Sequence, residues 1–320
     1  MAIEVKSQSI AAVVVTFNRK VLLIECLNAL LNQEHPLDRI YLIDNASSDG
    51  TSELLGKEGL LAHPMIEYIR LPQNMGGAGG FYEGIKLAHQ ASYDWIWVMD
   101  DDAEPKNDAL KKLFEGKNID ELMHYSGVCG VKVGLDGKPQ YAHRGNFNVK
   151  TGPAPLSKTE AAIEQNINYS SFVGLLINSK AVNNTGYPLE KFFIWYDDLE
   201  YCLRLGHYGP ILYRPKSIIL HKDIAPLDRR LGPFRVPSRH PYAIQWKYLC
   251  GFRNHIYLMM HHGRRGFFWA LYMLLRKLLK IAICDPNKLV LMRYFFWYWK
   301  QGVGMTDFYT IKPKEWMTLI

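Results

Sequence analysis

The sequence lacks any pairing pattern among its cysteines. Its five cysteines are scattered and odd in number, and no two of them form a C-x-x-C pair. A disulfide framework needs an even, regularly spaced set, and a structural zinc site needs closely spaced thiolates or histidines. We therefore expect neither, and the cysteine pattern fits a reducing compartment.

The sequence also lacks a hydrophobic run that suits a membrane span. Its longest apolar segment, 267–283, is interrupted by Arg276, Lys277 and Lys280, and each such charge at the centre of a spanning helix costs about 2.5–3.5 kcal/mol. The opening residues include Glu4 and show no basic region followed by an apolar run, so no signal peptide is expected. These absences predict a cytoplasmic protein that touches a membrane at most at its surface.

Net charge is present, but it is concentrated in one segment. Residues 240–300 carry ten Lys or Arg against one acid, Asp285, so this segment has a net charge of +9. Because the whole chain has a net charge of +7, the rest of the chain has a net charge of −2. The same segment contains 15 of the 41 Phe, Trp and Tyr residues. With 48% hydrophobic residues, the chain as a whole is too apolar to be disordered.

The first hundred residues alternate strand and helix patterns. Apolar, often β-branched runs predict strands at 10–16, 39–43, 65–70 and 94–99. Helical spacing and helix-start signals predict helices at 19–33, from about 51, and from a glycine-rich loop to about 90. This order predicts an α/β fold with a parallel sheet, whose ligands gather at the carboxyl ends of the strands.

The remainder of the chain divides into two parts. Residues 127–220 predict mixed β structure with long loops, and 134–155, rich in Gly, Pro and Asn, predicts a flexible excursion. Prolines within 233–241 predict a boundary between a domain over 1–235 and a helical domain over 236–320.

Three consecutive carboxylates, Asp100–Asp102, follow the fourth predicted strand. Like charges this close need a counter-ion, and oxygen-rich clusters suit Mn²⁺ or Mg²⁺ bridging a diphosphate. The alternative is a solvated turn that caps the next helix.

A glycine-rich loop, Asn74–Phe81, lies between a predicted strand and a predicted helix. Glycines allow close backbone approach, and a helix N-terminus offers free amides to a phosphate or a sugar hydroxyl. The loop has neither the dinucleotide-binding glycine pattern nor a Gly-Lys-Ser/Thr ending. A tight turn is the structural alternative, although four glycines in five positions exceed what a turn needs.

An aromatic and acidic cluster occupies residues 192–201 (FFIWYDDLEY). Rings beside paired carboxylates suit a sugar platform next to a general base, whereas acids at a helix N-terminus are the structural alternative. His221 follows a hydrophobic strand, and a lone histidine is more often structural than a metal ligand.

Together these motifs resemble the inverting family 2 glycosyltransferases with the GT-A fold, a mixed Rossmann-like sheet flanked by helices. The matching elements are Val14–Arg19, Ile43–Thr51, the Asn-x-Gly-Gly loop, the Met-Asp-Asp-Asp strand ending and Asp197–Glu200 with a downstream His. They cover roughly residues 10–225. Within the family, the sequence looks most like bacterial galactofuranosyltransferases, with rhamnosyltransferases as close relatives.

The resemblance implies roles for individual residues. The implied donor-binding residues are Thr16, Asn18, Arg19, Asp44, Asn74, Gly76, Gly77, Asp100, Asp101 and Trp195. The implied ligands of Mn²⁺ or Mg²⁺ are Asp100, Asp102 and His221. The implied catalytic group is Asp198 as base, with Asp197 and Glu200 binding or orienting the sugars. Because Tyr196 separates Trp195 from the acids, which ring contacts the sugar stays open.

The implied reaction is a single displacement in which galactofuranose moves from UDP-galactofuranose to a lipid-linked polysaccharide acceptor. A dTDP-rhamnose-dependent rhamnosyltransferase is the alternative enzyme, and a sugar-nucleotide-binding protein without catalysis is the alternative outside enzymes. Acceptor, linkage position and oligomeric state are left open by the sequence.

The basic aromatic segment 240–300 has three interpretations. Amphipathic, Trp- and Tyr-rich basic stretches suit a membrane interface, which predicts peripheral attachment to the inner face of the cytoplasmic membrane, where a lipid-linked acceptor would lie. Packing of the rings on the catalytic domain is the second. Nucleic-acid binding is disfavoured because the Trp residues lie in apolar runs rather than between cations. In related enzymes a pair like Arg253-Asn254 follows an aromatic run, which suggests a contact with an acceptor diphosphate.

Overall fold

The computed structural model describes residues 8–222, 245–263, 266–284 and 288–304, and these form two compact units. The first unit comprises 8–147, 153–190 and 198–222; the second comprises 148–152, 191–197 and the described residues from 245 on. The predicted boundary between residues 235 and 236 lies outside the described residues and stays a prediction.

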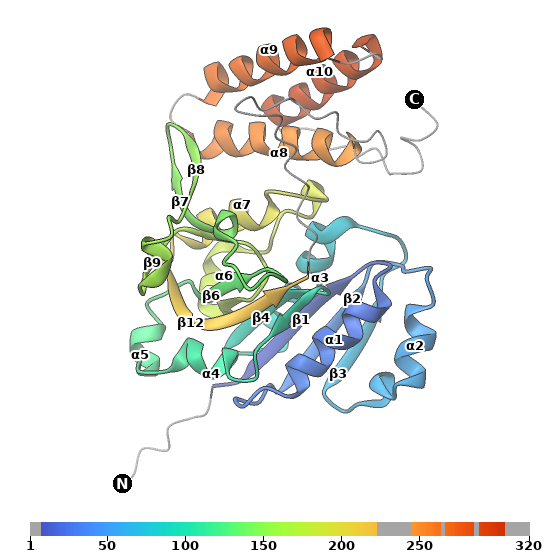
Figure 1. Ribbon diagram of the computed structural model, residues 1–320, viewed down its shortest axis with the longest axis vertical. Coiled ribbons are helices and arrows are strands. Elements are labelled where there is room, and N and C mark those ends of the chain that lie inside the picture. Colours follow the sequence, from blue (N-terminus) through green and yellow to red (C-terminus); the bar gives the residue numbers. More distant parts are fainter. Residues whose placement is uncertain (1–7, 223–244, 264–265, 285–287, 305–320) are drawn as a thin grey trace. The chain divides into compact units, whose positions relative to one another are not determined.

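A mixed sheet forms the centre of the first unit (Figure 1). Its strands follow the order β3-β2-β1-β4-β11-β6-β12-β5, with β9 also paired to β12. Their bounds are β1 Ile10–Thr16, β2 Arg39–Asp44, β3 Ile66–Arg70, β4 Trp95–Asp100, β5 Ala103–Pro105, β6 Gly127–Val133, β9 Gln165–Ile167, β11 Leu175–Asn178 and β12 Ile211–His221. The four strands predicted in the first hundred residues are thereby confirmed to within a residue.

The sheet is parallel only in part. The pairs formed by β1 with β2 and β4, by β2 with β3, and by β6 with β12 are parallel. β11 instead runs antiparallel between β4 and β6, and β5 and β9 run antiparallel to β12. The mixed sheet implied by the family resemblance is therefore confirmed, and an all-parallel sheet is not.

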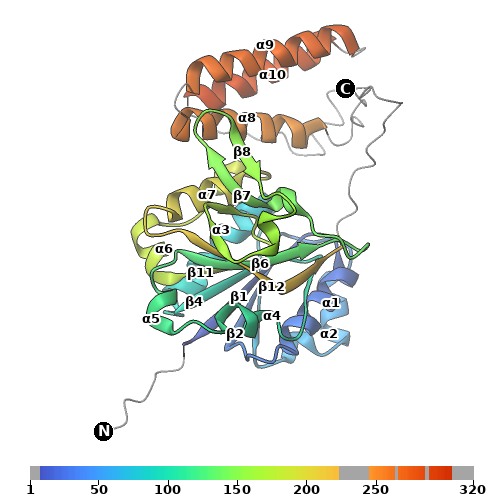
Figure 2. The same ribbon diagram turned by 60° about the vertical axis from the view of Figure 1, so that its left-hand side comes forward.

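Helices cover both faces of this sheet (Figure 1, Figure 2). Their bounds are α1 Lys20–Leu31, α2 Thr51–Lys57, α3 Gly76–Gln90, α4 Ala109–Phe114, α5 Ile119–Leu122, α6 Ser179–Thr185 and α7 Asp197–Leu205. Side chains of β1 alternate between the faces, as strand geometry requires. Val13 and Val15 meet glycines of α3, whereas Ala12 and Val14 join the main hydrophobic core with α1 and α4.

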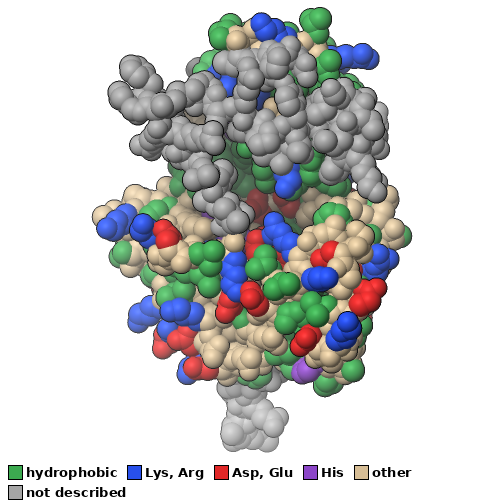
Figure 3. Space-filling model, turned by 45° about the vertical axis from the view of Figure 1, so that its right-hand side comes forward, with side chains coloured by type: hydrophobic (Ala, Val, Ile, Leu, Met, Phe, Trp, Pro, Cys, Tyr) green, Lys and Arg blue, Asp and Glu red, His purple; other side chains and the backbone are tan. Residues whose placement is uncertain are grey.

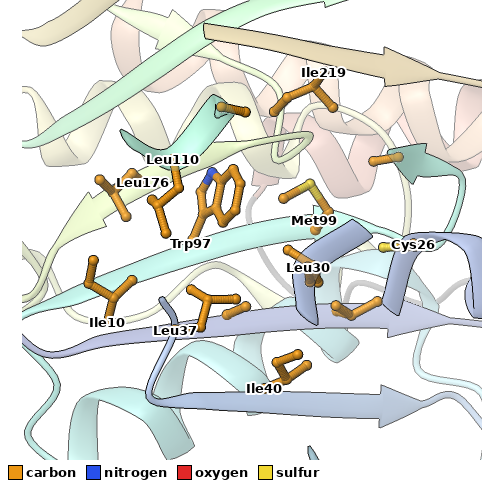
Figure 4. Close-up of a cluster of buried hydrophobic side chains, with 14 of the residues drawn as sticks. Ile10, Cys26, Leu30, Leu37, Ile40, Trp97, Met99, Leu110, Leu176 and Ile219 are labelled. Carbon is orange, nitrogen blue, oxygen red and sulfur yellow. The ribbon is translucent and has the colours of Figure 1, made fainter. Parts of the chain in front are cut away.

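That core explains why the apolar strands are continuous runs. Figure 4 shows Trp97 and Met99 of β4 beside Leu110 of α4 and Leu176 of β11. All four side chains are fully buried. Burying such a side chain stabilises the fold by about 1.5–3 kcal/mol relative to exposure, so the core fixes the strand ends where the polar residues lie.

The expected flexible excursion at 134–155 is wrong. Two strands, β7 Arg144–Asn148 and β8 Gly152–Pro155, form a hairpin there and build a second small sheet with β10 Tyr169–Ser170. Arg144 is 2% exposed and donates to the carbonyls of Gly130 and Val173. A buried polar side chain thus fastens a segment whose composition alone suggests a loop.

Three helices account for most of the described second unit: α8 Gln245–His262, α9 Gly266–Cys284 and α10 Lys288–Gly304. They lie side by side and share an aromatic and aliphatic core (Figure 2). None of the helices in the described part of the chain is long and apolar enough to cross a membrane. These three helices contain Lys and Arg but no Asp or Glu, whereas both signs are interspersed over the face of the first unit visible in Figure 3.

Candidate active site

The acidic triplet and His221 meet at the carboxyl ends of β4 and β12. One ligand atom each of Asp100, Asp102 and His221 lies within 4.8 Å of the other two. Nδ1 of His221 is buried and has no hydrogen-bond partner among the described residues. A buried polar atom without a partner is costly, and two carboxylates with an imidazole are donors that suit Mn²⁺ or Mg²⁺. The residues present therefore fit one divalent cation.

The carboxyls of the triplet differ in acidity. Burial, followed by the charges of Asp102 and Asp101, raises the pKa of Asp100 to about 8. Burial also raises the pKa of Asp101 to about 6, against the opposing charge of Arg19. Burial acts on Asp102 in the same direction, but His221 and Arg19 together lower its pKa. A bound cation would favour the ionised form of all three groups.

Asp101 faces the end of β1 rather than His221. Its Oδ2 accepts hydrogen bonds from Thr16 Oγ1 at 2.8 Å and from the Phe17 amide at 3.3 Å. Arg19 Nη1 lies 3.3 Å from Asp101 Oδ1 and 2.5 Å from Asp102 Oδ2. Arg19 keeps 45% of its side chain exposed, so it combines neutralisation of the triplet with access to a ligand. A direct contact of Thr16 or Arg19 with a nucleotide stays a prediction.

The end of β2 is held by its own polar network. Asp44 is 1% exposed and accepts hydrogen bonds from the Ser47 amide at 2.8 Å and from Tyr68 Oη at 2.6 Å. Asn18, in the left-handed region at φ 56°, accepts from the Ser48 amide at 2.7 Å. Asp44 and Asn18, two of the predicted donor-binding residues, thus shape the neighbouring strand ends, and their ligand contacts stay predictions.

The glycines of the glycine-rich loop and of α3 meet different structural requirements. Gly76 has a φ of 74°, which favours glycine, and its amide donates to Asn74 Oδ1 at 2.7 Å. A Cβ on Gly80 or Gly84 would lie 2.4 or 2.2 Å from a valine methyl of β1, so these two allow close packing of α3. A Cβ on Gly77 would meet nothing within 4 Å among the described residues. Packing therefore does not explain the glycine at position 77, and the ligand contact implied for Gly77 stays a prediction.

Asn45 joins this loop to β2, and the motif analysis missed it. Its Nδ2 donates to the Gly76 carbonyl at 3.0 Å, and its Oδ1 accepts from the Met75 amide at 3.1 Å. An amide has both a donor and an acceptor, so Asn45 can fix the loop in a way that a carboxylate cannot.

Lys132 on β6, which the motifs also missed, interacts electrostatically with Asp198 and with the acidic cluster. Burial raises the pKa of Asp198, and the charges of Lys132 and Arg144 oppose that rise. Lys132 is 1% exposed; burial and Arg144 lower its pKa to about 8, although Asp100, Asp102 and Asp198 act to raise it. A lone lysine inside the apolar strand GVCGVKV was the available signal. Lys132 links the candidate base to the candidate metal ligands.

The other acids of the α7 motif are placed differently. Glu200 is 2% exposed, and its two carboxylate oxygens accept from Arg204 at 2.8 and 2.9 Å. Arg204 also donates to the carbonyls of Thr185 and Tyr187, so the pair fastens α7. Asp197 is buried at the start of α7, and the ring of Trp195 is 38% exposed. Roles for these residues in sugar binding stay predictions.

A model of the family described as glycosyl transferase family 2 matches residues 11–186, which hold β1 to β4, the acidic triplet and the glycine-rich loop. The chain belongs to glycosyltransferase family 2. It is thus a glycosyltransferase, and a sugar-nucleotide-binding protein without catalysis is set aside.

Relatives of this family 2 glycosyltransferase are named for different sugars. Galactofuranosyltransferase GlfT1 of Mycolicibacterium smegmatis is 34% identical over 63% of this chain and 67% of its own length. The dTDP-rhamnosyl transferase RfbF of Shigella flexneri is 24% identical over 79% of this chain and 83% of its own length. The predicted similarity to galactofuranosyltransferases and to rhamnosyltransferases is thereby confirmed, whereas the sugar that this chain transfers is not.

Among solved structures, the GalNAc-T7 complex with UDP, GalNAc and Mn²⁺ matches 93% of this chain and 56% of its own, with a TM-score of 0.58 and 14% identity. At that identity the match shows the fold alone. The GT-A architecture expected from the motifs is confirmed.

One expectation for this glycosyltransferase is overturned by burial. Arg253 and Asn254 were expected to contact an acceptor diphosphate, but both are 0% exposed. They donate instead to backbone carbonyls of 191–195. Basic and amide side chains in an aromatic helix need not face a ligand, because the same groups satisfy buried carbonyls.

Proposed function

We propose that this glycosyltransferase moves galactofuranose from UDP-galactofuranose to a lipid-linked glycan acceptor in bacterial surface glycan assembly, with inversion at the anomeric carbon. Asp100, Asp102 and His221 would hold Mn²⁺ or Mg²⁺, and Asp198 would act as the base. The observation that carries the proposal is that ligand atoms of Asp100, Asp102 and His221 lie within 4.8 Å of one another in the same compact unit that contains Asp198.

The residues of the unit have distinct tasks in this reaction. Asp198 takes the proton of the acceptor hydroxyl, whose oxygen forms a bond to the anomeric carbon as the bond to the diphosphate oxygen breaks. Lys132 and Arg144 favour the carboxylate form of Asp198 that this step needs. A cation held by Asp100, Asp102 and His221 would offset negative charge on the nucleoside diphosphate. Attack from the face opposite the leaving group inverts the configuration.

Galactofuranose is favoured as the donor sugar by the higher identity to GlfT1, 34% against 24% for RfbF. RfbF matches more of this chain, 79% against 63%. dTDP-rhamnose is therefore the alternative donor. Both proposals use the same metal ligands and the same catalytic base, Asp198. They differ only in the nucleoside of the donor and in the sugar that is transferred.

An exposed apolar face on α9 supports a lipid-linked acceptor at a membrane surface. Exposed apolar residues recur there at intervals of three or four, which places them on one helix face. Their side chains are 57–75% exposed: Phe268, Tyr272, Leu275, Leu279 and Ile283. Arg276 and Lys280 are exposed on the same helix. An apolar face beside cations, without acids, matches the interface of an anionic bilayer.

The donor assignment is tested by supplying the purified protein with UDP-galactofuranose or dTDP-rhamnose, Mn²⁺ and a short lipid-diphosphate glycan. We expect nucleotide release and product with UDP-galactofuranose. Product with dTDP-rhamnose alone would replace the donor, and product with neither would overturn the proposed function.

A further inference from the structure

Asn254 of α8 binds the backbone of the segment that leads into Asp197 and Asp198. Its Nδ2 donates to the carbonyl oxygens of Phe192, Ile194 and Trp195 at 2.9, 3.0 and 2.9 Å. Arg253 adds contacts from its Nη2 to the carbonyls of residues 191 and 192, both at 3.1 Å. Two consecutive buried side chains thus satisfy most carbonyls of a short irregular segment.

The orientation of the Asn254 amide is set by Arg253. Oδ1 of Asn254 accepts a hydrogen bond from Arg253 Nε at 2.9 Å. A guanidinium nitrogen only donates, so the amide oxygen must face Arg253 and the amide nitrogen must face the carbonyls. Arg253 itself lies over the ring of Tyr298, 5.6 Å from its centroid. The pair acts as one unit.

The bound carbonyls belong to the peptide groups with the least common backbone geometry. Phe193, Trp195 and Tyr196 have φ values of 64°, 66° and 67°, and this left-handed region is uncommon for residues other than glycine. The carbonyls of residues 192, 194 and 195 each belong to the peptide group immediately before one of these three residues. Asn254 therefore holds each strained peptide directly. Strain of this kind persists only where the surroundings over-determine it, and it is concentrated at functional sites.

The same helix also receives the rings of the segment. A Cβ on Gly251 would lie 2.6 Å from Cε3 of Trp195, so only glycine leaves room for the indole. Tyr248 packs edge-on against Trp195 with ring centroids 5.1 Å apart. Tyr196 stacks on His255 at 4.8 Å. Trp195 nevertheless remains 38% exposed, so a rigidly held ring keeps a surface for a ligand.

We propose that Asn254, oriented by Arg253, and Gly251 are positioning residues that fix Trp195 as the platform for the acceptor sugar. The family resemblance implied a donor contact for Trp195, and this proposal assigns the acceptor to it instead. This inference rests on the proposed function, in which the segment directly precedes the base Asp198. A segment that served packing alone would not need three left-handed residues around a partly exposed indole. The chemical class of the ligand is a sugar ring, whose apolar C–H face packs on an aromatic ring.

The test uses Asn254→Asp in the full-length protein. The shape of the side chain is kept, but a carboxylate oxygen replaces the donor opposite three carbonyl oxygens. Deuterium uptake should rise in peptides covering 191–196 and stay unchanged in peptides of β1 and β4. The matched control is Asn183→Asp, an exposed asparagine of α6, which should leave both regions as in the wild type.

Kinetics separate positioning from general damage. With acceptor present, transfer by Asn254→Asp should fall by about 10²-fold, the loss expected for a displacement of about 1 Å, chiefly through a raised KM for acceptor. Hydrolysis of the donor by water should keep its rate. Equal loss of hydrolysis and transfer, or wild-type transfer, would overturn the inference.

Gly251→Ala covers the case in which Asn254→Asp does not fold. Alanine favours a helix, so α8 should stay formed while the added methyl displaces Trp195. The same rise in acceptor KM is expected, and an unchanged KM would contradict the inference. If the wild type transfers no sugar from either donor, the proposed function fails, whereas the deuterium-uptake result still decides whether Asn254 holds the segment.

Discussion

Nε2 of His221 lies 3.1 Å from Oδ1 of Asp102, and the register of β5 on β12 explains this approach. Ala103, directly after Asp102, pairs with His221. The Lys222 amide donates to the Asp102 carbonyl at 2.9 Å. Backbone pairing therefore fixes Asp102 and His221 relative to each other before any ion binds.

Asp198→Asn should abolish sugar transfer while nucleotide binding is retained. The amide cannot take a proton from the acceptor hydroxyl, yet it has nearly the same shape as the carboxyl. Transfer is measured as product formed at saturating donor, and binding by calorimetry with UDP and Mn²⁺. Asp120→Asn, an exposed carboxyl on α5, is the control. Near-normal transfer by Asp198→Asn would remove this residue from the role of base.

Lys132→Met should move the acidic limb of the pH–rate profile to higher pH. Burial raises the pKa of Asp198, and Lys132 opposes that rise. Without the ammonium the pKa of Asp198 rises, so the active carboxylate is lost at a higher pH as the solution is acidified. The profile is recorded at saturating Mn²⁺, because Asp100 also titrates. Lys216→Met, at an exposed position of β12, should leave the limb unmoved, and an unmoved limb in Lys132→Met would contradict the account.

The first half of the fold was predictable because its signals are local. Strands such as β1 are apolar runs buried on both faces, and their ends carry the polar residues. Lys132 left a local signal, a lone lysine in an apolar strand, but its electrostatic role and the loop contacts of Asn45 were not predictable, because they depend on which elements are neighbours. The sequence order of β6, β11 and β12 does not reveal that β11 enters the sheet antiparallel between β4 and β6.

Gly77→Ala and Gly84→Ala separate the two reasons for glycine on α3. A Cβ on Gly84 would lie 2.2 Å from Val13 Cγ1, and overpacking of this kind costs about 1–3 kcal/mol. Gly77→Ala should not lower the free energy of unfolding but should weaken binding of UDP and Mn²⁺. Thermal unfolding and calorimetry check both. Equal UDP affinity in Gly77→Ala and wild type would exclude close ligand approach at this residue.

The aromatic segment before Asp198 shows a second limit of sequence interpretation. The residues FFIWY predicted rings beside acids, but not that three of them adopt left-handed backbone geometry. Asn254, about sixty residues further along the chain, donates to the backbone of this segment, and side-chain-to-backbone contacts at such separation leave no local pattern. For the same reason, the sequence led to the wrong prediction that Arg253 and Asn254 contact an acceptor diphosphate.

Leu275→Gln with Leu279→Gln should reduce binding to vesicles of phosphatidylglycerol and phosphatidylcholine. Both residues lie on the exposed apolar face of α9, at 58% and 63% exposure, so their replacement lowers the apolar area available to the interface without opening the core. Co-sedimentation measures the bound fraction. The double variant Arg276→Glu with Lys280→Glu should bind anionic vesicles more weakly than the wild type. This difference should be largest at low salt, where charges are screened least.

Vesicles of pure phosphatidylcholine serve as the control for the electrostatic part. Equal sedimentation of both double variants and the wild type would exclude α9 as the membrane-facing surface. If light scattering shows that the wild type dimerises through this face, the partner of the α9 face is a second copy of the chain and not a bilayer.

The most direct test of the account is the binding of Mn²⁺ followed by electron paramagnetic resonance, because it does not depend on the donor sugar. The wild type should bind one ion, more tightly with UDP present, and His221→Ala should weaken the binding by at least about tenfold. Equal Mn²⁺ affinity in the wild type and His221→Ala would contradict a site formed by Asp100, Asp102 and His221.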